Sequence, residues 1–147
     1  MSTELIAIAP PSSDLAWLAH KLRRDVFVHE QHVPPELEYD ELDLKSVHYV
    51  TLVGGDLVAA LRVIDLPEHQ KISRFVVHAA YRGRGVGRRL LEHTIAALAE
   101  LGHTRLYLEA QVSAIGFYER LGFAAYGPVY QDAGIDHRRM RNYEPDA

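Results

Sequence analysis

A glycine-rich segment between an apolar run and a long amphipathic pattern constrains the fold of this chain most. The segment reads YRGRGVGRR and spans residues 81–89. Before it, ISRFVVH at 72–78 predicts a strand; after it, apolar residues recur on one helical face from 86 to 101, and Gly102 is placed to end that helix. Such a turn exposes consecutive backbone N–H groups at the positive end of the helix dipole. The segment therefore predicts an anion site, with phosphate as the natural ligand.

Three phosphate-binding patterns fit this segment poorly. A P-loop needs Lys followed by Ser or Thr after its last glycine, whereas two arginines follow Gly87. The dinucleotide pattern is G-x-G-x-x-G, but here the glycines alternate at 83, 85 and 87. RNA-binding RGG segments lack flanking order, and the net charge of −4 argues against a nucleic-acid partner. The anion is therefore expected to be another phosphorylated ligand, and no nucleic acid is expected.

The remaining patterns predict one mixed α/β domain over residues 1–147. The further expected elements are a helix at 13–27 begun by Ser or Asp, a hairpin at 47–65 around GGD, a strand at 105–111, a short helix at 114–121, and strands at 123–130 and 137–143.

Two prolines and many acids predict that residues 28–43 form an irregular, exposed segment. Its acids could attract a cationic amine, although a solvated acidic loop is the simpler interpretation. These acids are Glu36, Glu38, Asp40, Glu41 and Asp43.

Residue types that are missing exclude several kinds of chemistry. The chain has no cysteine, which rules out disulfides, thiolate metal sites and a cysteine acyl-enzyme. The sequence HEQH at 29–32 places its second histidine one residue too early for H-E-x-x-H, because position 33 is Val33; no metal is expected.

The N-terminus lacks a signal-peptide pattern and no apolar run is long enough to cross a membrane, so a soluble, cytoplasmic protein without a membrane partner is expected.

The order Arg82, two residues, Gly85, one residue, Gly87 matches R/Q-x-x-G-x-G/A, and here the sequence resembles the GNAT superfamily of acyl-CoA-dependent N-acetyltransferases. GFYERLGF at 116–123 resembles the family's second signature. The runs LRRDVFVHEQHVPPELEYDELD at 22–43 and VYQDAGIDHRRM at 129–140 resemble its ElaA-like and YjcF-like branch. Ala79 and Asp136 depart from the family pattern, since both positions usually carry proline.

This resemblance implies an α/β GNAT fold, in which a mixed, mostly antiparallel sheet is splayed between the cofactor-binding strands and flanked by helices. It implies acetyl-CoA as co-substrate and a primary amine of a small molecule or peptide as acceptor; a homodimer is left open. The residues that it places at the cofactor are Val76, Val77, Arg82, Gly83, Arg84, Gly85, Val86, Gly87, Arg88, Gln111 and Tyr118.

Acetyl transfer needs a neutral amine, although a free alkyl amine has a pKa of about 10.4. The resemblance assigns Tyr118 as the acid that protonates the leaving thiolate and a backbone N–H near Val77 as the donor to the carbonyl oxygen. Glu109 is a candidate base beside the cleft. The candidates on the acceptor side are Glu30, His48, His78 and His137. Direct attack in a ternary complex is expected, because no cysteine can carry the acetyl group.

Two other functions remain open at this point. One is a non-catalytic acyl-CoA-binding sensor, in which Tyr118 is only a core tyrosine. The other is an acyl-homoserine-lactone-type synthase. The chain is short for such an enzyme, and the pyrophosphate loop favours coenzyme A over a carrier protein as the acyl donor.

Overall fold

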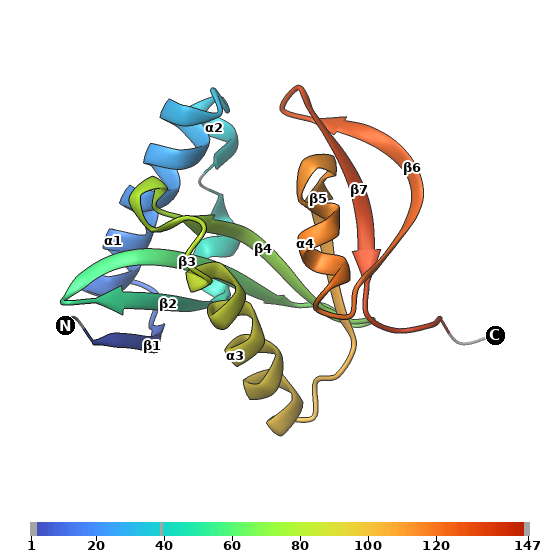
Figure 1. Ribbon diagram of the computed structural model, residues 1–147, viewed down its shortest axis with the longest axis horizontal. Coiled ribbons are helices and arrows are strands. Elements are labelled where there is room, and N and C mark those ends of the chain that lie inside the picture. The colour runs from blue at the N-terminus through green and yellow to red at the C-terminus, as the bar shows by residue number, and fades with distance from the viewer. Residues whose placement is uncertain (1–2, 39, 146–147) are drawn as a thin grey trace.

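The central element of the fold is a seven-stranded sheet with the strand order β1-β2-β3-β4-β5-β7-β6 (Figure 1). The computed structural model describes residues 3–38 and 40–145, without the side chain of Glu41. Neighbouring strands are antiparallel except for the parallel pair β4–β5, which confirms the predicted mixed, mostly antiparallel sheet. The strands are β1 (Glu4–Ala9), β2 (Val47–Val53), β3 (Asp56–Asp65), β4 (Gln70–Val77), β5 (Leu106–Gln111), β6 (Ala124–Asp132) and β7 (Ile135–Arg141).

Helices cover both faces of this sheet. Ser13 caps α1, as predicted, by accepting a hydrogen bond from the N–H of Ala16 at 3.1 Å. The helix then continues as a π-helix from Arg24 to Glu30, past the predicted end. The α-helices are α1 (Asp14–Arg23), α2 (Pro35–Glu38), α3 (Val86–Glu100) and α4 (Ile115–Glu119).

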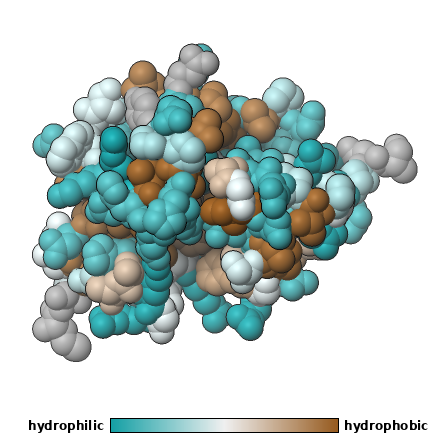
Figure 2. Space-filling view, turned by 90° about the horizontal axis from the view of Figure 1, so that it is seen from above, coloured by the Kyte–Doolittle hydropathy of each residue, from teal (hydrophilic) through white to brown (hydrophobic). Residues whose placement is uncertain are grey.

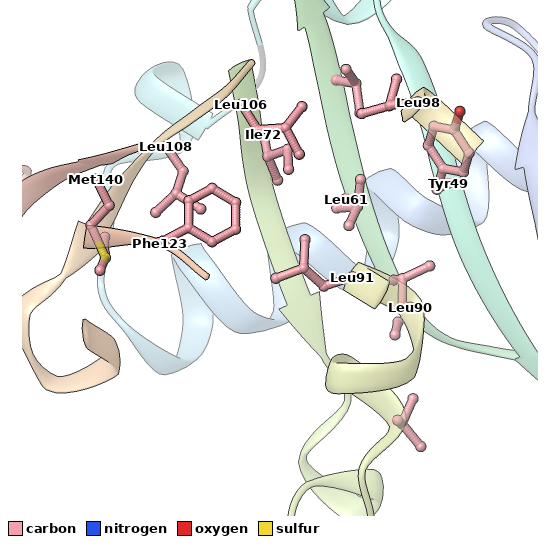
Figure 3. Close-up of a cluster of buried hydrophobic side chains, with 14 of the residues drawn as sticks. Tyr49, Leu61, Ile72, Leu90, Leu91, Leu98, Leu106, Leu108, Phe123 and Met140 are labelled. Carbon is pink, nitrogen blue, oxygen red and sulfur yellow. The ribbon is translucent and has the colours of Figure 1, made fainter. Parts of the chain in front are cut away.

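Alternation along β2 and β3 divides the core between the two faces. Tyr49 and Leu61 pack on the side of α3, where Leu90 and Leu91 are fully buried (Figure 3). Val50 and Ala60, the next residues, pack on the side of α1. Burial of each large apolar side chain contributes roughly 2 kcal/mol, so the two clusters hold both helices against the sheet.

The sheet opens between β4 and β5. These strands pair through only three residue pairs, from Gln70↔Leu106 to Ile72↔Leu108, and then diverge (Figure 1). Beyond Ile72, β4 pairs only with β3, and the register shifts opposite Leu61, where Arg74 has a φ of +52°. The edge of β4 that faces β5 therefore has no strand partner there, and its backbone groups can hydrogen-bond an extended ligand.

The front of the chain differs from the sequence-based prediction. Strand β1 was not predicted, and it covers the outer edge of β2. Residues 28–43 are not simply irregular and exposed, because they include α2 and lead into a 3₁₀ helix at Glu41–Lys45. Glu38 and Asp43 are 5% and 1% exposed, so the interpretation as a solvated acidic loop was wrong for both.

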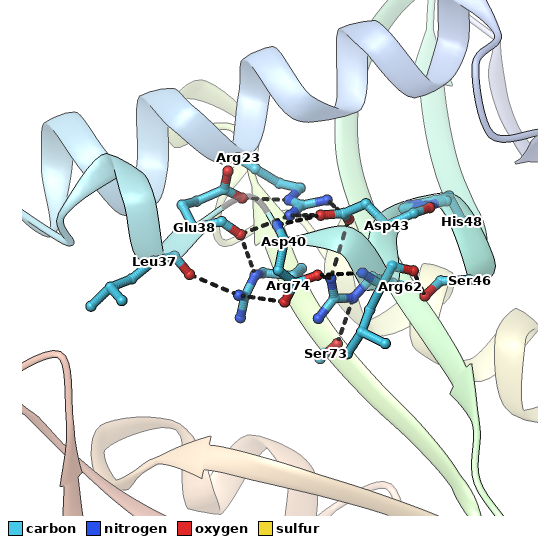
Figure 4. Close-up of polar contacts among 11 residues, drawn as sticks. Arg23, Leu37, Glu38, Asp40, Asp43, Ser46, His48, Arg62, Ser73 and Arg74 are labelled. Carbon is cyan, nitrogen blue, oxygen red and sulfur yellow. Dashed lines mark hydrogen bonds and ion pairs between the residues drawn. The ribbon is translucent and has the colours of Figure 1, made fainter.

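A buried ionic cluster explains how these two carboxylates are accommodated (Figure 4). Arg23 donates to Glu38 and to Asp43, both at 2.5 Å, and Asp43 also lies 3.2 Å from Arg62. Buried charges are tolerated only when paired and hydrogen-bonded in this way. The cluster fixes the segment at 35–46 against α1 and β3.

We expect this cluster to make stability depend on pH. Burial raises the pKa of Asp43, but the hydrogen bond and charge of Arg23 outweigh this and lower it from 3.8 to about 2. Because the folded-state pKa is the lower one, the stabilisation is fully present above about pH 4 and is lost as the pH falls toward 2; its size is about 2 kcal/mol.

Chemical denaturation between pH 2 and pH 6 measures this effect. The variant Asp43→Asn should be less stable at neutral pH and show a weaker decline in the free energy of unfolding with acid. Asp56→Asn, at the exposed first position of β3, is the matched control and should keep the wild-type decline. An unchanged decline in Asp43→Asn contradicts the assignment.

Candidate active site

The glycine-rich segment begins α3 with a left-handed residue. Gly85 is the N-cap and has a φ of +78°, a conformation that L side chains rarely adopt. Within the described residues, no backbone carbonyl accepts from the N–H groups of residues 83–88, as expected for the first turn of a helix. These N–H groups and the helix dipole are the features on which the prediction of an anion site rests.

Gly87 brings α3 close to β4. A Cβ at this position would lie 3.0 Å from Cγ2 of Val77 and 3.2 Å from Cζ of Phe75, so a larger residue would push the helix away from the strand. A groove of about 530 Å³ lies along this contact. It is lined by residues 75–77, 81–83 and 85–88, and by Gln31, Ala114, Phe117 and Tyr118.

The arginines of the loop are mostly engaged by carboxylates. Arg82 binds Glu30 through two hydrogen bonds of 2.5 and 2.8 Å, and this contact lowers the pKa of Glu30. Arg89 likewise binds Glu4 of β1, at 2.7 and 2.8 Å. In the same segment Arg88 pairs with Glu92, and Arg84 lies 5.6 Å from the ring centre of Tyr81. Among the described residues, the backbone N–H groups of residues 83–88 and the guanidinium of Arg84 thus have no hydrogen-bond acceptor.

A second, polar pocket of about 340 Å³ lies on the other side of the opening between β4 and β5. Its charged and polar lining comes from Asp40, Arg62, Lys71, Ser73, Arg74, Glu109, Gln111, Asp132 and His137. It meets the groove at four residues that line both: Gln31, Phe75, Ala114 and Tyr118. Figure 2 views the molecule from above Figure 1 and shows hydrophobic side chains exposed among hydrophilic ones in the middle of the upper face.

Tyr118 lies at this junction, in an aromatic cluster. Its ring is 5.2 Å from Phe117, 6.2 Å from Phe123 and 6.4 Å from Phe75, centre to centre. Burial raises the pKa of its hydroxyl, which therefore stays protonated. No described residue is hydrogen-bonded to this hydroxyl, so it is available to a ligand.

Glu109 lines the polar pocket and is held by neighbours. Lys71 lies 2.8 Å from Oε1, and the hydroxyl of Tyr107 donates to Oε2 at 3.2 Å. Burial raises the pKa of Glu109, but the contact with Lys71 outweighs it and leaves the pKa lowered. Burial and this carboxylate also raise the pKa of Tyr130 to about 12. Glu109 is therefore anionic. A carboxylate with a lowered pKa is a weak base, so Glu109 is better suited to bind an ammonium group than to remove a proton from it.

Gln111 lines the polar pocket rather than the groove that the resemblance implied for it. Its Nε2 donates to Oε1 of Gln31 at 2.9 Å. Val76 and Val86 line the groove, although both residues are only 3% exposed and pack in the core.

The four predicted acceptor-side residues do not lie together. His137 lines the polar pocket, and its Nδ1 donates to the carbonyl of Ile135 at 2.7 Å, which leaves Nε2 as an acceptor in the neutral ring. His48 is 2% exposed and its Nε2 contacts the carbonyl of Asp43 at 2.8 Å, so it is a buried packing residue. His78 is exposed and caps a 3₁₀ turn, while Glu30 holds Arg82.

Gln31 and Phe75 were not predicted as site residues, although both lie at the junction. Gln31 could have been predicted, because it belongs to the run LRRDVFVHEQHVPPELEYDELD, which carries part of the family resemblance.

Within residues 3–38 and 40–145, no helix is both long and apolar enough to cross a membrane. The same residues contain no group of three His, Asp or Glu side chains placed to hold a metal ion.

A sheet that opens beside a glycine-rich helix N-terminus, with a polar pocket that meets the resulting groove, is the arrangement of an acyl-CoA-dependent N-acyltransferase. The chain belongs to the acetyltransferase (GNAT) family, whose domain model matches residues 8–143. It is an enzyme of this family, its co-substrate is an acyl-CoA, and its acceptor is an amine.

Relatives place the chain in the ElaA-like and YjcF-like branch. The uncharacterized N-acetyltransferase YjcF of Bacillus subtilis is 36% identical over 123 residues, which are 83% of this chain and 88% of YjcF. An acyl-CoA N-acyltransferase from Pseudomonas aeruginosa has 33% identity and a TM-score of 0.86 over 96% of this chain and 100% of its own. Escherichia coli ElaA has 28% identity and a TM-score of 0.84, with coverage of 97% and 100%.

Proposed function

We propose that this protein transfers an acetyl group from acetyl-CoA to a primary amine of a small molecule or peptide, by direct attack in a ternary complex. The observation that carries the proposal is the junction at Gln31, Phe75, Ala114 and Tyr118, where the groove and the polar pocket meet. Two ligands that enter from the two sides can react there without a covalent enzyme intermediate.

The groove suits acetyl-CoA, which supplies the acetyl thioester. The N–H groups around Gly85 are available to hold its pyrophosphate, and the unpaired edge of β4 can bind an extended arm such as pantetheine. A backbone N–H near Val77 is our candidate donor to the carbonyl oxygen. Tyr118 is our candidate acid for the leaving sulfur, since burial keeps its hydroxyl protonated.

The acceptor amine must lose a proton before or during attack. Glu109 can attract the ammonium group because it is held anionic. His137 is the stronger candidate for the base, because its Nδ1 donates to the carbonyl of Ile135 and its Nε2 remains to accept a proton in the same pocket. His48 is left out of this proposal because it is buried.

Steady-state kinetics with acetyl-CoA and a panel of amines tests the proposal. We expect release of free CoA that depends on the amine, an acetylated product by mass spectrometry, and intersecting initial-velocity lines. Parallel lines, or acetylated protein during turnover, would exclude direct attack. Tight acetyl-CoA binding without transfer to any amine would favour the alternative, a non-catalytic acyl-CoA sensor.

A further inference from the structure

Two arginines on one wall of the polar pocket have donors that no described residue uses. The guanidinium of Arg62 donates through Nε to Ser73 at 3.1 Å and through Nη1 to Asp40 at 2.7 Å. That of Arg74 donates through Nε to the carbonyl of Glu38 at 2.9 Å and through Nη2 to that of Leu37 at 3.0 Å. Among the side chains and backbone groups that the structure describes, which do not include the side chain of Glu41, none accepts from Nη2 of Arg62 or from Nη1 of Arg74.

Both guanidinium groups are held in place by burial and by hydrogen bonds to neighbouring residues, unlike arginines on an open surface. Arg62 has a side chain that is 3% exposed, and Arg74 one that is 25% exposed. In Figure 4 the outer ends of both guanidinium groups point to the same side, away from α1 and toward the C-terminal strands. Both line the polar pocket, so their unused donors are accessible from it.

The positive charge of Arg74 is only weakly compensated by neighbouring carboxylates. Its only carboxylate contact among the described residues is Asp40, at 3.5 Å, and the other oxygen of Asp40 already accepts from Arg62 and from the N–H of Leu42. Burial lowers the pKa of Arg74, and repulsion by Arg62 and Arg23 lowers it further. An anion placed against Arg74 would relieve this repulsion.

The backbone directs Arg74 into the pocket at some cost. Its φ of +52° is unusual for a residue with a Cβ, and the register shift between β3 and β4 occurs at this point. As a result Arg74 and Phe75, which are consecutive, both line the polar pocket. Phe75 belongs to the junction with the groove, so the arginine lies close to the place of reaction.

The facing wall has the opposite character. Glu109 of β5 and Asp132 of β6 supply carboxylates, and His137 of β7 supplies a ring nitrogen. The pocket thus presents cations on the side of β3 and β4 and acceptors of an ammonium group on the side of β5, β6 and β7. A ligand with both charges, a short distance apart, complements it.

We infer that the acceptor of this enzyme is a compact amine that also carries an anionic group, a carboxylate or a phosphate, bound by Arg74 together with Arg62. This inference rests on the proposed function, because it names the substrate class of the same site. Arg74 contacts the substrate in this account but takes no part in proton transfer.

Matched pairs of amines test the inference in the wild-type enzyme. L-Phenylalanine is compared with L-phenylalaninamide, and O-phosphoethanolamine with ethanolamine. Each rate is divided by the concentration of the unprotonated form of the amine at the assay pH. Because charge-assisted hydrogen bonds are strong, we expect kcat/KM to favour the anionic member of at least one pair by about 10- to 100-fold. The pair that shows it identifies the anion. Absence of preference in both pairs overturns the inference.

Two variants identify the residue responsible. Arg74→Met keeps the length of the side chain and removes its charge, so the preference should fall about 10-fold or to the small part that Arg62 alone maintains. Lys71→Met removes a cation of the same pocket that Glu109 already neutralises, so the ratio within each pair should persist. If Arg74→Met retains the preference, Arg74 serves only to hold Leu37 and Glu38, and the inference is wrong.

Binding measurements separate this inference from the proposed function. If no amine is acetylated, the proposed function fails, and calorimetric titration of the CoA-bound wild type with L-phenylalanine and its amide still tests the anion site. If transfer occurs without an anion preference, only the inference fails. Should Arg74→Met not fold, Arg74→Lys replaces it and should reduce the preference without abolishing it, since lysine lacks the planar fork; an undiminished preference overturns the inference.

Discussion

Replacing Gly85 with valine should weaken acetyl-CoA binding by about 100-fold or more, because several charge-assisted hydrogen bonds from backbone N–H groups depend on this turn. Gly85 has a φ of +78°, and a Cβ there would lie 2.7 Å from Nη1 of Arg89. A β-branched side chain strains this backbone, at a cost of about 1–3 kcal/mol, and stands where a phosphate would approach. Isothermal titration calorimetry with acetyl-CoA measures the loss.

Gly102 provides a matched control at the opposite end of the same helix. It has a φ of +87°, and a Cβ added there would meet only open space, so Gly102→Val should carry a similar backbone strain. Both variants are then expected to show similar decreases in melting temperature. Only Gly85→Val should lose acetyl-CoA affinity; equal affinity in the two variants would show that the loop does not hold the cofactor.

Tyr118→Phe should lower kcat by about 100- to 10,000-fold while acetyl-CoA affinity stays within a fewfold of wild type. The substitution removes the hydroxyl at the junction and keeps the ring that packs against Phe75, Phe117 and Phe123. Because burial raises the pKa of Tyr118, the wild-type acid should remain protonated through the alkaline range in which an ordinary tyrosine ionises. Rapid-quench measurement of CoA release, with calorimetry for binding, separates the two effects.

Tyr49 gives the comparison for this substitution. It is 3% exposed, and burial also raises its pKa, but it lies in the core on β2 and lines neither the groove nor the polar pocket. Tyr49→Phe should therefore leave kcat close to wild type. Undiminished turnover in Tyr118→Phe, with the same pH profile, would assign Tyr118 to packing alone.

Local patterns explain why the glycine-rich turn, with the strand before it and the helix after it, could be predicted from the sequence. The glycines at 83, 85 and 87 lie between a strand and a helix that are continuous in the chain, so their geometry follows from neighbouring residues alone. The same holds for the caps of α1 and α3 and for the hairpin of β2 and β3. The family resemblance then supplied the fold and the class of reaction, which the comparisons confirmed.

The polar pocket and the segment packed beside it depend on contacts between residues that are distant in the sequence. Arg23 meets carboxylates 15 and 20 positions away, and no local pattern distinguishes those acids from solvated ones. His48 was expected beside the acceptor but is buried by the segment that this cluster holds. The positive φ of Arg74 has no sequence signal either, since glycine or asparagine is the usual residue at such a position.

The linings of the groove and the polar pocket overlap at only four residues, and this has an evolutionary consequence. The groove is encoded mainly by one stretch, residues 75–88, whereas the polar pocket draws on dispersed residues that include 40, 62, 71–74, 109, 111, 132 and 137. Mutations can therefore accumulate in the second set and change the accepted amine while the first set continues to bind the same acyl donor. Descent within this family would then preserve the donor more faithfully than the acceptor.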